Sequence, residues 1–322
     1  MMKERVLELL WQNADAYLSG AALARSLSVS RTAVWKAVEQ LRAEGYAIES
    51  VTKRGYRLCS KSDVLSEQGV RKYLQNPAIT PLVFASVGST NTVLKAMAAD
   101  GAPEGIAVIA GEQTAGRGRM GRRFYSPADS GLYLSLLLRP QLPAAEAVGI
   151  TACAAVAVCE AIEELSGRET QIKWVNDVFV GGRKACGILT EASLDCESGS
   201  LSYAVPGIGI NTAAPAGDFP PELQWIAGAV FDGEKPPELR CRLAARVLDK
   251  LMAYSADPGD PALFEAYQRR SLVLGKPINI LMPGAEPVRA EAVALCRDFG
   301  LLARLPDGSL RKLSSGEVSV RV

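Results

Sequence analysis

Residues 173–189, KWVNDVFVGGRKACGIL, decide the fold of this chain. The apolar runs on either side of Gly181-Gly182 predict two strands, Ile172–Val180 and Lys184–Ser193, and a two-residue glycine turn makes such strands antiparallel. A second turn near Ser198-Gly199 leads into a third apolar run, Leu201–Ile210. The sequence therefore predicts an antiparallel sheet in the middle of the chain.

Outward from this sheet, more apolar segments are separated by turn residues. Strands are expected at Leu82–Val87, Ile106–Gly111 and Leu132–Leu138, and helices at Ala144–Leu165, Pro237–Tyr254 and Pro261–Ser271. This order does not repeat strand and helix regularly, which favours a mixed α/β layer over a parallel βαβ fold. Asn211–Glu234 is predicted as a long loop rich in Pro, Gly and Ala, and loops of this length are often functional.

The two ends of the chain predict separate domains. After a first helix, the helices Ala21–Leu27 and Arg31–Glu44 flank a short turn, and Tyr46–Leu58 predicts a hairpin. This order is typical of a winged helix-turn-helix. The last fifty or so residues alternate short strands with turns and predict a small β-barrel. At 322 residues, two or three domains are expected, and the segment patterns predict three, with bounds 1–62, 63–271 and 272–322.

Composition removes several classes of function. The chain has no histidine, which excludes Ser-His-Asp and Cys-His catalysis and histidine-ligated metals. Its seven cysteines are odd in number and contain no CxxC, so a disulfide framework or cysteine-rich zinc site is not expected. The first residues lack the apolar run of a signal peptide, and no segment has the length of a membrane span. These features indicate a cytoplasmic protein.

Charge is distributed unevenly along the chain. The net charge is +1, so the whole molecule does not attract nucleic acid strongly. Residues 1–60, however, carry nine Lys and Arg against six Asp and Glu, which gives +3. Any DNA site is therefore expected in the predicted winged helix.

The most informative motif is an arginine loop, which we define as residues 116–123, GRGRMGRR. Its glycine spacing matches GxGxxG, but a dinucleotide fingerprint opens a helix, and Pro127 follows here instead. A Walker A loop would need Gly-Lys-Ser/Thr. Glycine backbone and arginine side chains together suit a phosphate, although a plain basic surface loop or a nucleic-acid contact is also compatible.

Three further segments place polar residues or glycines in or beside predicted strands. Asn176 and Asp177 could lie near phosphates or Mg²⁺, with Lys184 close by, or they could form a plain turn with a solvated lysine. Ser89-Thr90-Asn91 could cap a helix or, with Gln113, contact a small polar ring. Gly207 and Gly209 would let a flat ligand approach the backbone.

Taken in order and spacing, GRGRMGR, KWVND, RKACGIL and GIGIN resemble the biotin–protein ligase family. With a winged helix before them and a barrel after them, the chain resembles the bacterial bifunctional ligases that also repress the biotin operon. The resemblance implies an α+β multidomain chain with a mixed-sheet α/β ligase domain of the biotin/lipoate ligase type and a C-terminal SH3-like β-barrel. Val175 stands where the family usually has proline, which could alter the strand bend.

The resemblance also implies an activity and its site. Biotin would react with ATP to give biotinyl-5′-AMP, which then passes to a lysine of a biotin carboxyl carrier protein. The residues implied for biotin and biotinyl-AMP are Ser89, Thr90, Asn91, Gln113, Arg117, Gly118, Arg119, Arg122, Lys184, Gly187, Gly207 and Gly209. Those on the nucleotide side are Asn176, Asn211 and Trp225. Lys184, Arg119 and Asp177 would be catalytic, with Asp177 also a candidate Mg²⁺ ligand.

For repression, the recognition helix and the wing would meet operator DNA. The residues implied are Ser30, Arg31, Thr32, Trp35, Lys36, Lys53 and Arg54. The chain would act as a homodimer when biotinyl-AMP is bound, with the acetyl-CoA carboxylase subunit and other biotin-dependent carboxylases as acceptors and no membrane partner. A lipoate–protein ligase, a ligand-sensing repressor without catalysis, and a winged helix used only for protein contact remain alternatives.

Overall fold

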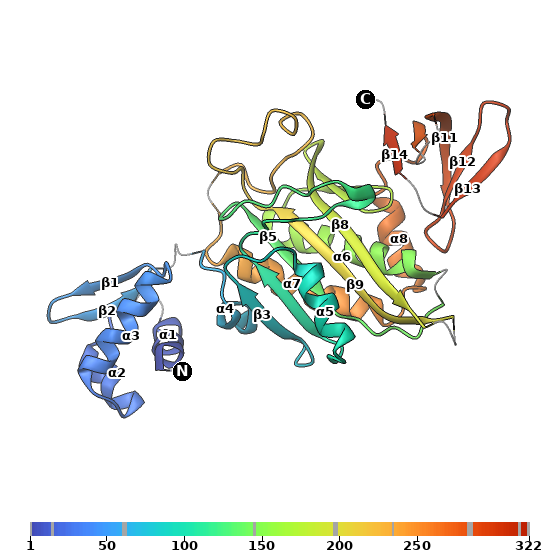
Figure 1. Cartoon of the computed structure of the whole chain (residues 1–322). Coiled ribbons are helices and arrows are strands. Elements are labelled where there is room, and N and C mark those ends of the chain that lie inside the picture. Colours follow the sequence, from blue (N-terminus) through green and yellow to red (C-terminus); the bar gives the residue numbers. More distant parts are fainter. Residues whose placement is uncertain are drawn as a thin grey trace. The chain divides into compact units, whose positions relative to one another are not determined.

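The computed structural model describes residues 2–13, 16–59, 63–143, 146–195, 199–233, 235–281, 286–314 and 317–320 (Figure 1). The chain divides into two compact units. The first comprises Met1–Tyr73 with Lys235–Arg242, and the second comprises Leu74–Glu234 with Leu243–Val322.

The first unit is a winged helix, as predicted. Its elements are α1 (Met2–Gln12), α2 (Gly20–Leu27), α3 (Arg31–Ala43), β1 (Ile48–Val51), β2 (Gly55–Leu58) and α4 (Glu67–Tyr73). Ser19 and Ser30 cap α2 and α3 by accepting bonds from the backbone of Ala22 and Ala33. Leu10, Leu23 and Val38 are buried together where the three helices meet, so the apolar faces read from the sequence do form a core.

The wing is fixed by a close approach of two backbones. Tyr56 and Leu18 exchange N–H···O bonds of 2.8 Å in both directions. Gly55, with φ of +110°, lies so close that an added Cβ would sit 2.1 Å from the oxygen of Leu18. Only glycine fits there, which explains why the hairpin β1–β2 turns where it does.

The second unit is built on a seven-stranded sheet. Its strands are β3 (Thr80–Phe84), β4 (Ile106–Ala110), β5 (Gly131–Leu136), β6 (Thr170–Lys173), β7 (Asp177–Val180), β8 (Arg183–Leu194) and β9 (Leu201–Asn211). They lie in the order β3-β4-β5-β9-β8-β7-β6, and only β3 and β4 pair in parallel. The predicted mixed sheet and the antiparallel turn at Gly181-Gly182 are confirmed. Of the second predicted turn, Ser198 lies outside the described residues.

One predicted strand, Ile172–Val180, is wrong. The chain turns back at Trp174-Val175-Asn176, so β6 and β7 form a hairpin, and the Trp174–Val175 peptide bond is cis. The side chain of Trp174 donates Nε1–H to the oxygen of Phe299 at 2.8 Å, and Tyr267 donates its hydroxyl to the oxygen of Val175 at 3.1 Å. These contacts from distant segments stabilise the turn, which the apolar run of residues 172–180 did not predict.

Helices cover both faces of this sheet. They are α5 (Thr90–Ala99), α6 (Ala147–Ser166), α7 (Leu239–Ser255) and α8 (Pro261–Arg269), and a 3₁₀ turn, η1, spans Arg119–Gly121. The predicted helix start at Ala144 lies outside the described residues. Figure 1 shows α5 and α6 on opposite sides of the strands. No helix among the described ranges combines the length and apolar character of a membrane span.

Strand alternation leaves one face of β8 and β9 bare. Successive side chains of a strand point to opposite faces. On the α6 face, Ile188 pairs with Ile208 and both are buried. On the α5 face, Gly187 pairs with Gly209, and the partner of Leu189 is Gly207. The sheet therefore presents a strip of backbone with few side chains beside the amino end of α5.

The C-terminal part forms a five-stranded antiparallel sheet. Its strands are β10 (Pro277–Leu281), β11 (Val288–Leu295), β12 (Leu301–Arg304), β13 (Leu310–Leu313) and β14 (Glu317–Val320), in the order β13-β12-β11-β10-β14. In the described part of the chain, β13 and β14 are its edges, so closure into an SH3-like barrel stays a prediction. Phe299, before β12, packs its ring against Phe264 and Tyr267 of α8.

We expect Phe299→Ala to destabilise the second unit by about 3–5 kcal/mol, because a ring that is 2% exposed would leave a cavity between α8 and the turn at Trp174. Urea unfolding followed by tryptophan fluorescence would measure this. Leu310→Ala is the control, since Leu310 is 57% exposed and its loss should cost less than about 0.5 kcal/mol. Equal losses in the two variants would contradict this role of Phe299.

Candidate active site

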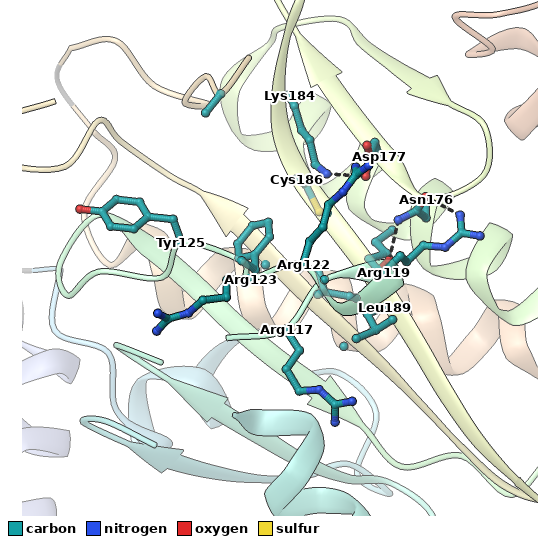
Figure 2. Close-up of a pocket in the computed structure, with 18 of the residues that line it drawn as sticks. Arg117, Arg119, Arg122, Arg123, Tyr125, Asn176, Asp177, Lys184, Cys186 and Leu189 are labelled. Carbon is teal, nitrogen blue, oxygen red and sulfur yellow. Dashed lines mark hydrogen bonds and ion pairs between the residues drawn. The ribbon is translucent and has the colours of Figure 1, made fainter. Parts of the chain in front are cut away.

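A cavity of about 430 Å³ lies over the bare strip of β8 and β9. This volume is in the range of sites for small ligands. Its walls come from the start of α5, the arginine loop, the turn after β6 and the long loop that follows β9. Figure 2 shows Arg119 and Arg122 of the arginine loop on the side of Asn176 and Asp177, with Lys184 next to Asp177.

The floor of the cavity depends on the absence of side chains. An added Cβ at Gly207 would lie 2.0 Å from Oδ1 of Asn91, and one at Gly209 would lie 2.4 Å from the ring of Phe124. At Gly187 an added Cβ would be 3.0 Å from that same ring. These glycines thus allow Asn91 and Phe124 to approach the backbone closely, and the approach of a flat ligand stays a prediction.

A polar cluster closes one end of the cavity. Gln113 accepts from the backbone N–H of Thr90 at 2.9 Å and donates to Ser126 at 3.1 Å. Ser135, on β5, bonds Oγ1 of Thr90 at 2.7 Å and Oδ1 of Asn91 at 2.6 Å. This end therefore offers fixed donors and acceptors to a small polar ring.

Ser89 and Asn91 do not serve as simple caps. Ser89 occupies the N-cap position of α5, but its side chain makes no capping bond. Asn91 donates Nδ2–H to the oxygen of Leu189 at 3.1 Å and to Glu191 at 2.9 Å. Both residues are buried. The structure therefore does not support helix capping as the role of these two side chains.

Glu191 is a charged residue of this cluster. Burial acts to raise the pKa of its carboxyl, but hydrogen bonds from Lys95 and Asn91 outweigh burial and hold the pKa below its usual value. The carboxyl is therefore ionised at neutral pH.

The arginine loop folds on itself as a small hairpin. The N–H of Gly118 bonds the oxygen of Arg122 at 2.7 Å, and the N–H of Phe124 bonds the oxygen of Gly116 at 3.0 Å. There is no helix after the glycines, which agrees with rejecting a dinucleotide fingerprint. In Figure 2, Arg119 and Arg122 lie on the side of Asn176 and Asp177, whereas Arg117 points away from them.

The charged end of the cavity brings together residues that are far apart in sequence. Lys184 Nζ lies 2.7 Å from Oδ1 of Asp177, and Arg119 donates to Oδ1 of Asn176 at 3.0 Å. Asn176 is itself fixed by a bond from Nδ2 to the oxygen of Ile188 at 2.8 Å. Two cations thus meet at one wall, held by partners that an anionic ligand could replace.

Cys186 also lines the cavity, next to this charged wall. Burial raises the pKa of its thiol well above the usual value, and the nearby Lys184 lowers it only in part. A protonated thiol is a poor nucleophile at neutral pH. Covalent chemistry at Cys186 is therefore not supported.

The long loop after β9 borders the other side of Lys184. The N–H of Lys184 bonds the oxygen of Ile226, and the N–H of Gly228 bonds the oxygen of Lys184, each at 2.9 Å. Asn211 donates to the oxygen of Gly228 at 3.1 Å. The predicted Trp225 is 85% exposed and does not line the cavity, whereas its neighbour Ile226 does.

Sequence reasoning missed several residues of the site. Phe124, which lies over the glycine floor, was not among the residues expected in the site. Ser135 and Glu191 were hidden inside apolar strands, where the only signal is a polar residue that packing would not demand. Leu223 and Ile226 lie in a loop whose composition gives no indication of which side chains point inward.

The described residues contain no group of three or more Cys, Asp or Glu side chains arranged for a metal ion. Asp177 is the acidic residue among those that line the cavity. Mg²⁺ is commonly held by one or two carboxylates together with substrate phosphates. The residues present therefore fit a metal ion that arrives with a nucleotide rather than one held by the protein alone.

In the first unit, a separate groove is lined by Arg31, Thr32, Trp35 and Lys53. Trp35 is 52% exposed on α3, which is unusual for so large an apolar side chain. Ser30, in contrast, is occupied as the cap of α3. Four of the seven predicted DNA-contacting residues thus border a common groove, whereas Ser30, Lys36 and Arg54 do not line it.

The charges of the wing are not equivalent. Arg57 is paired with Glu49 at 2.6 Å. The guanidinium groups of Arg54 and Arg57 lie over the ring of Tyr17, 5.3 and 4.8 Å from its centroid. Arg54 and Lys53 therefore remain as the wing cations best placed for phosphate contact.

Comparison with known proteins agrees with this architecture. Residues 3–57 match an HTH domain family, residues 83–211 match the biotin/lipoate A/B protein ligase family, and residues 273–321 match the biotin protein ligase C-terminal domain. The biotin protein ligase from Aquifex aeolicus, solved in complex with biotin and ATP, superposes with a TM-score of 0.61 at 26% identity, over 75% of this chain and 98% of that one. The fold and site thus define a ligase of the biotin/lipoate type that carries a helix-turn-helix domain.

Two relatives narrow the class of protein further. The bifunctional ligase/repressor BirA of Bacillus subtilis is 41% identical over 238 residues, 73% of each chain, and the protein of the same name from Escherichia coli is 28% identical over 94% of this chain and 92% of that one. The chain belongs to the family of bifunctional biotin ligase/repressors.

We expect Gly207→Ala to lower the free energy of unfolding by about 1–3 kcal/mol, because the new methyl group overlaps Asn91. Without that overlap, alanine would stabilise a strand slightly relative to glycine. Thermal unfolding would show the sign. The same change made in an Asn91→Ala background should cost little, because the overlapping side chain is gone, and Gly233→Ala, with no neighbour within 4 Å of the new Cβ, should be near neutral. A stabilised single variant would contradict the tight floor.

Proposed function

We propose that this chain activates biotin with ATP to give biotinyl-5′-AMP, transfers biotin to a lysine of a biotin carboxyl carrier protein, and represses transcription of biotin genes through its winged helix. The observation that carries the enzymatic part is the meeting of Arg119 and Lys184 at one wall of a cavity whose floor is bare backbone. Membership of the ligase/repressor family supports both parts.

The two ends of the cavity suit the two substrates. The cluster of Thr90, Gln113 and Asn91 would take the polar rings of biotin, with Ser89 beside it, because fixed donors and acceptors discriminate such a group. The glycine floor of Gly187, Gly207 and Gly209 would lie under the flat head and chain. Asn176, Asn211 and the loop bearing Ile226 would border the nucleotide, and Arg117, Gly118 and Arg122 would belong to the loop that covers the product.

In the first step, an oxygen of the biotin carboxylate attacks the α-phosphorus of ATP, and the bond to the bridging oxygen breaks as pyrophosphate leaves. This nucleophile is already ionised at neutral pH, so the absence of histidine is no obstacle. The difficulty is the approach of one anion to another. Lys184 and Arg119 would reduce that repulsion by exchanging Asp177 and Asn176 for ligand oxygens.

In the second step, the neutral amine of the acceptor lysine attacks the carbonyl carbon of the mixed anhydride, and AMP leaves. Asp177 is the candidate acceptor for the proton released by the amine, since it is a carboxylate at the charged wall. When bound, Mg²⁺ would neutralise phosphate charge, and Asp177 is the candidate protein ligand for it. Closure of the arginine loop would keep water from the anhydride.

We expect Lys184→Ala to reduce biotin-dependent exchange of pyrophosphate into ATP at least 100-fold, which is the usual size for loss of a cation that stabilises developing charge. Lys276→Ala, on the surface outside the cavity, should retain full exchange. Thermal unfolding would show that both variants are folded. Unchanged exchange by Lys184→Ala would refute the assignment, and exchange that responds to lipoate instead of biotin would assign a different substrate.

For repression, Arg31, Thr32, Trp35 and Lys36 of the recognition helix would enter the major groove, and Lys53 and Arg54 would touch phosphates. Ser30 would act mainly by capping the helix. A two-fold operator requires two copies of the chain, so we propose that a homodimer carrying biotinyl-AMP binds DNA.

We expect Arg54→Ala to weaken binding to a mixed-sequence DNA duplex and to reduce the slope of log K against log salt by about 1, because one phosphate contact is lost. Arg57→Ala should leave the slope unchanged, since Glu49 already pairs with this charge. Fluorescence anisotropy at several salt concentrations would measure both slopes. Binding that does not depend on salt would favour a winged helix that contacts only protein.

A further inference from the structure

Glu191 joins three elements of the candidate site. Its Oε1 accepts from Lys95 of α5 at 2.7 Å and from Arg117 of the arginine loop at 3.3 Å. Its Oε2 accepts from Nδ2 of Asn91 at 2.9 Å. Its own position on β8 is fixed by pairing with Val205 of β9. One carboxylate therefore connects the central sheet, the helix that begins at the polar cluster and the loop that crosses the cavity.

The carboxylate also determines how Asn91 is oriented. With Nδ2 directed to Glu191 and to the oxygen of Leu189, the amide must present Oδ1 to Ser135 and to the bare backbone of Gly207. A flipped amide would place oxygen against two acceptors, which is unfavourable. The polar end of the cavity therefore owes one of its fixed acceptors to Glu191.

The charge of Glu191 is what holds Arg117. The side chain of Glu191 is 17% exposed, whereas that of Arg117 is 52% exposed. Arg117 points away from the cluster of Arg119, Asn176 and Asp177. The amino end of the arginine loop is therefore anchored at the biotin end of the cavity, while its middle, at Arg119, contacts the charged end.

We propose that Glu191 is a positioning residue for the biotin half of the reaction, which orients the amide of Asn91 and anchors the arginine loop through Arg117. The kinetic part of this inference rests on the proposed ligase function. The structural part does not, because the contacts exist without any ligand.

Two substitutions separate the two roles. Glu191→Gln removes the charge that holds Lys95 and Arg117, but its amide oxygen can still accept from Asn91. Glu191→Ala removes both. Glu160→Gln is the matched control: Glu160 is 23% exposed and pairs with Lys250 at 2.9 Å and with Tyr254 at 2.5 Å, outside the cavity.

The loop is tested first, with no substrate present. Brief trypsin treatment of the folded full chain, with fragments identified by mass spectrometry, measures cleavage between Arg117 and Phe124. We expect both Glu191 variants to be cut there about threefold faster than the parent chain, the effect of losing one partly exposed ion pair. Glu160→Gln should be cut at the parental rate. Parental rates in both Glu191 variants would overturn the anchoring role.

The biotin site is tested by pyrophosphate exchange. We expect KM for biotin to rise about tenfold in Glu191→Ala, as for loss of one hydrogen bond to a charged group, and about twofold in Glu191→Gln. KM for ATP and kcat should stay within about twofold of the parent, a split that a general loss of stability would not give. Unchanged KM for biotin in Glu191→Ala, or an equal rise in Glu160→Gln, would overturn the positioning role.

The outcomes distinguish the two proposals. A parent chain that shows no biotin-dependent exchange would refute the proposed function, while the trypsin comparison would still decide whether Glu191 anchors the loop. A parent chain that exchanges normally, with Glu191 variants that match it in cleavage and in KM, would leave the function intact and refute this inference.

Discussion

The close approach of Asn91 and Phe124 to the backbone of three glycines is the constraint on which the whole site depends. Because side chains alternate along a strand, glycine at 187, 207 and 209 clears one face of β8 and β9 while the other face keeps its isoleucines in the core. A methyl group at two of these positions would meet Asn91 or Phe124 at no more than 2.4 Å. The sheet can therefore be both the hydrophobic centre of the second unit and the floor of a cavity, without any extra layer of structure.

Charge in the site is arranged so that each cation has a replaceable partner. Lys184 has Asp177, and Arg119 has Asn176. Bare cations in a partly buried cavity would be costly, and permanently bonded ones could not respond to a ligand. Pairing with one carboxylate and one amide allows phosphate oxygens to take over at modest cost. The turn Trp174-Val175-Asn176 is hydrogen-bonded to Phe299 and Tyr267. Because Phe299 directly precedes β12, the C-terminal sheet helps to place the charged wall.

Much of the fold and of the candidate site was predictable from the sequence, and the exceptions have physical causes. Strand existence and the turn at Gly181-Gly182 followed from apolar runs bounded by glycine, and the winged helix followed from helical spacing and caps. The split of Ile172–Val180 into β6 and β7 was not predicted, although Asn176-Asp177 was weighed as a plain turn, because the residues that stabilise the turn, Phe299 and Tyr267, are distant in sequence. Motif residues such as Lys184 and Arg119 were identified together, although only the fold shows that they share a wall. Trp225 was expected at the nucleotide side, yet in the described loop Ile226, although 55% exposed, lines the cavity and Trp225 does not.

Glu191 shows that sequence motifs alone do not identify every residue of a site. No short pattern contains it, and in a strand it could equally have been a solvated edge charge. Its importance arises because β8 runs the length of the cavity, so that Lys184 near one end and Glu191 near the other belong to a single strand. A rigid strand fixes the distance between the two charges, and the arginine loop contacts partners at both ends, Asn176 and Glu191. The strand and the loop therefore form two separate connections between the halves of the cavity.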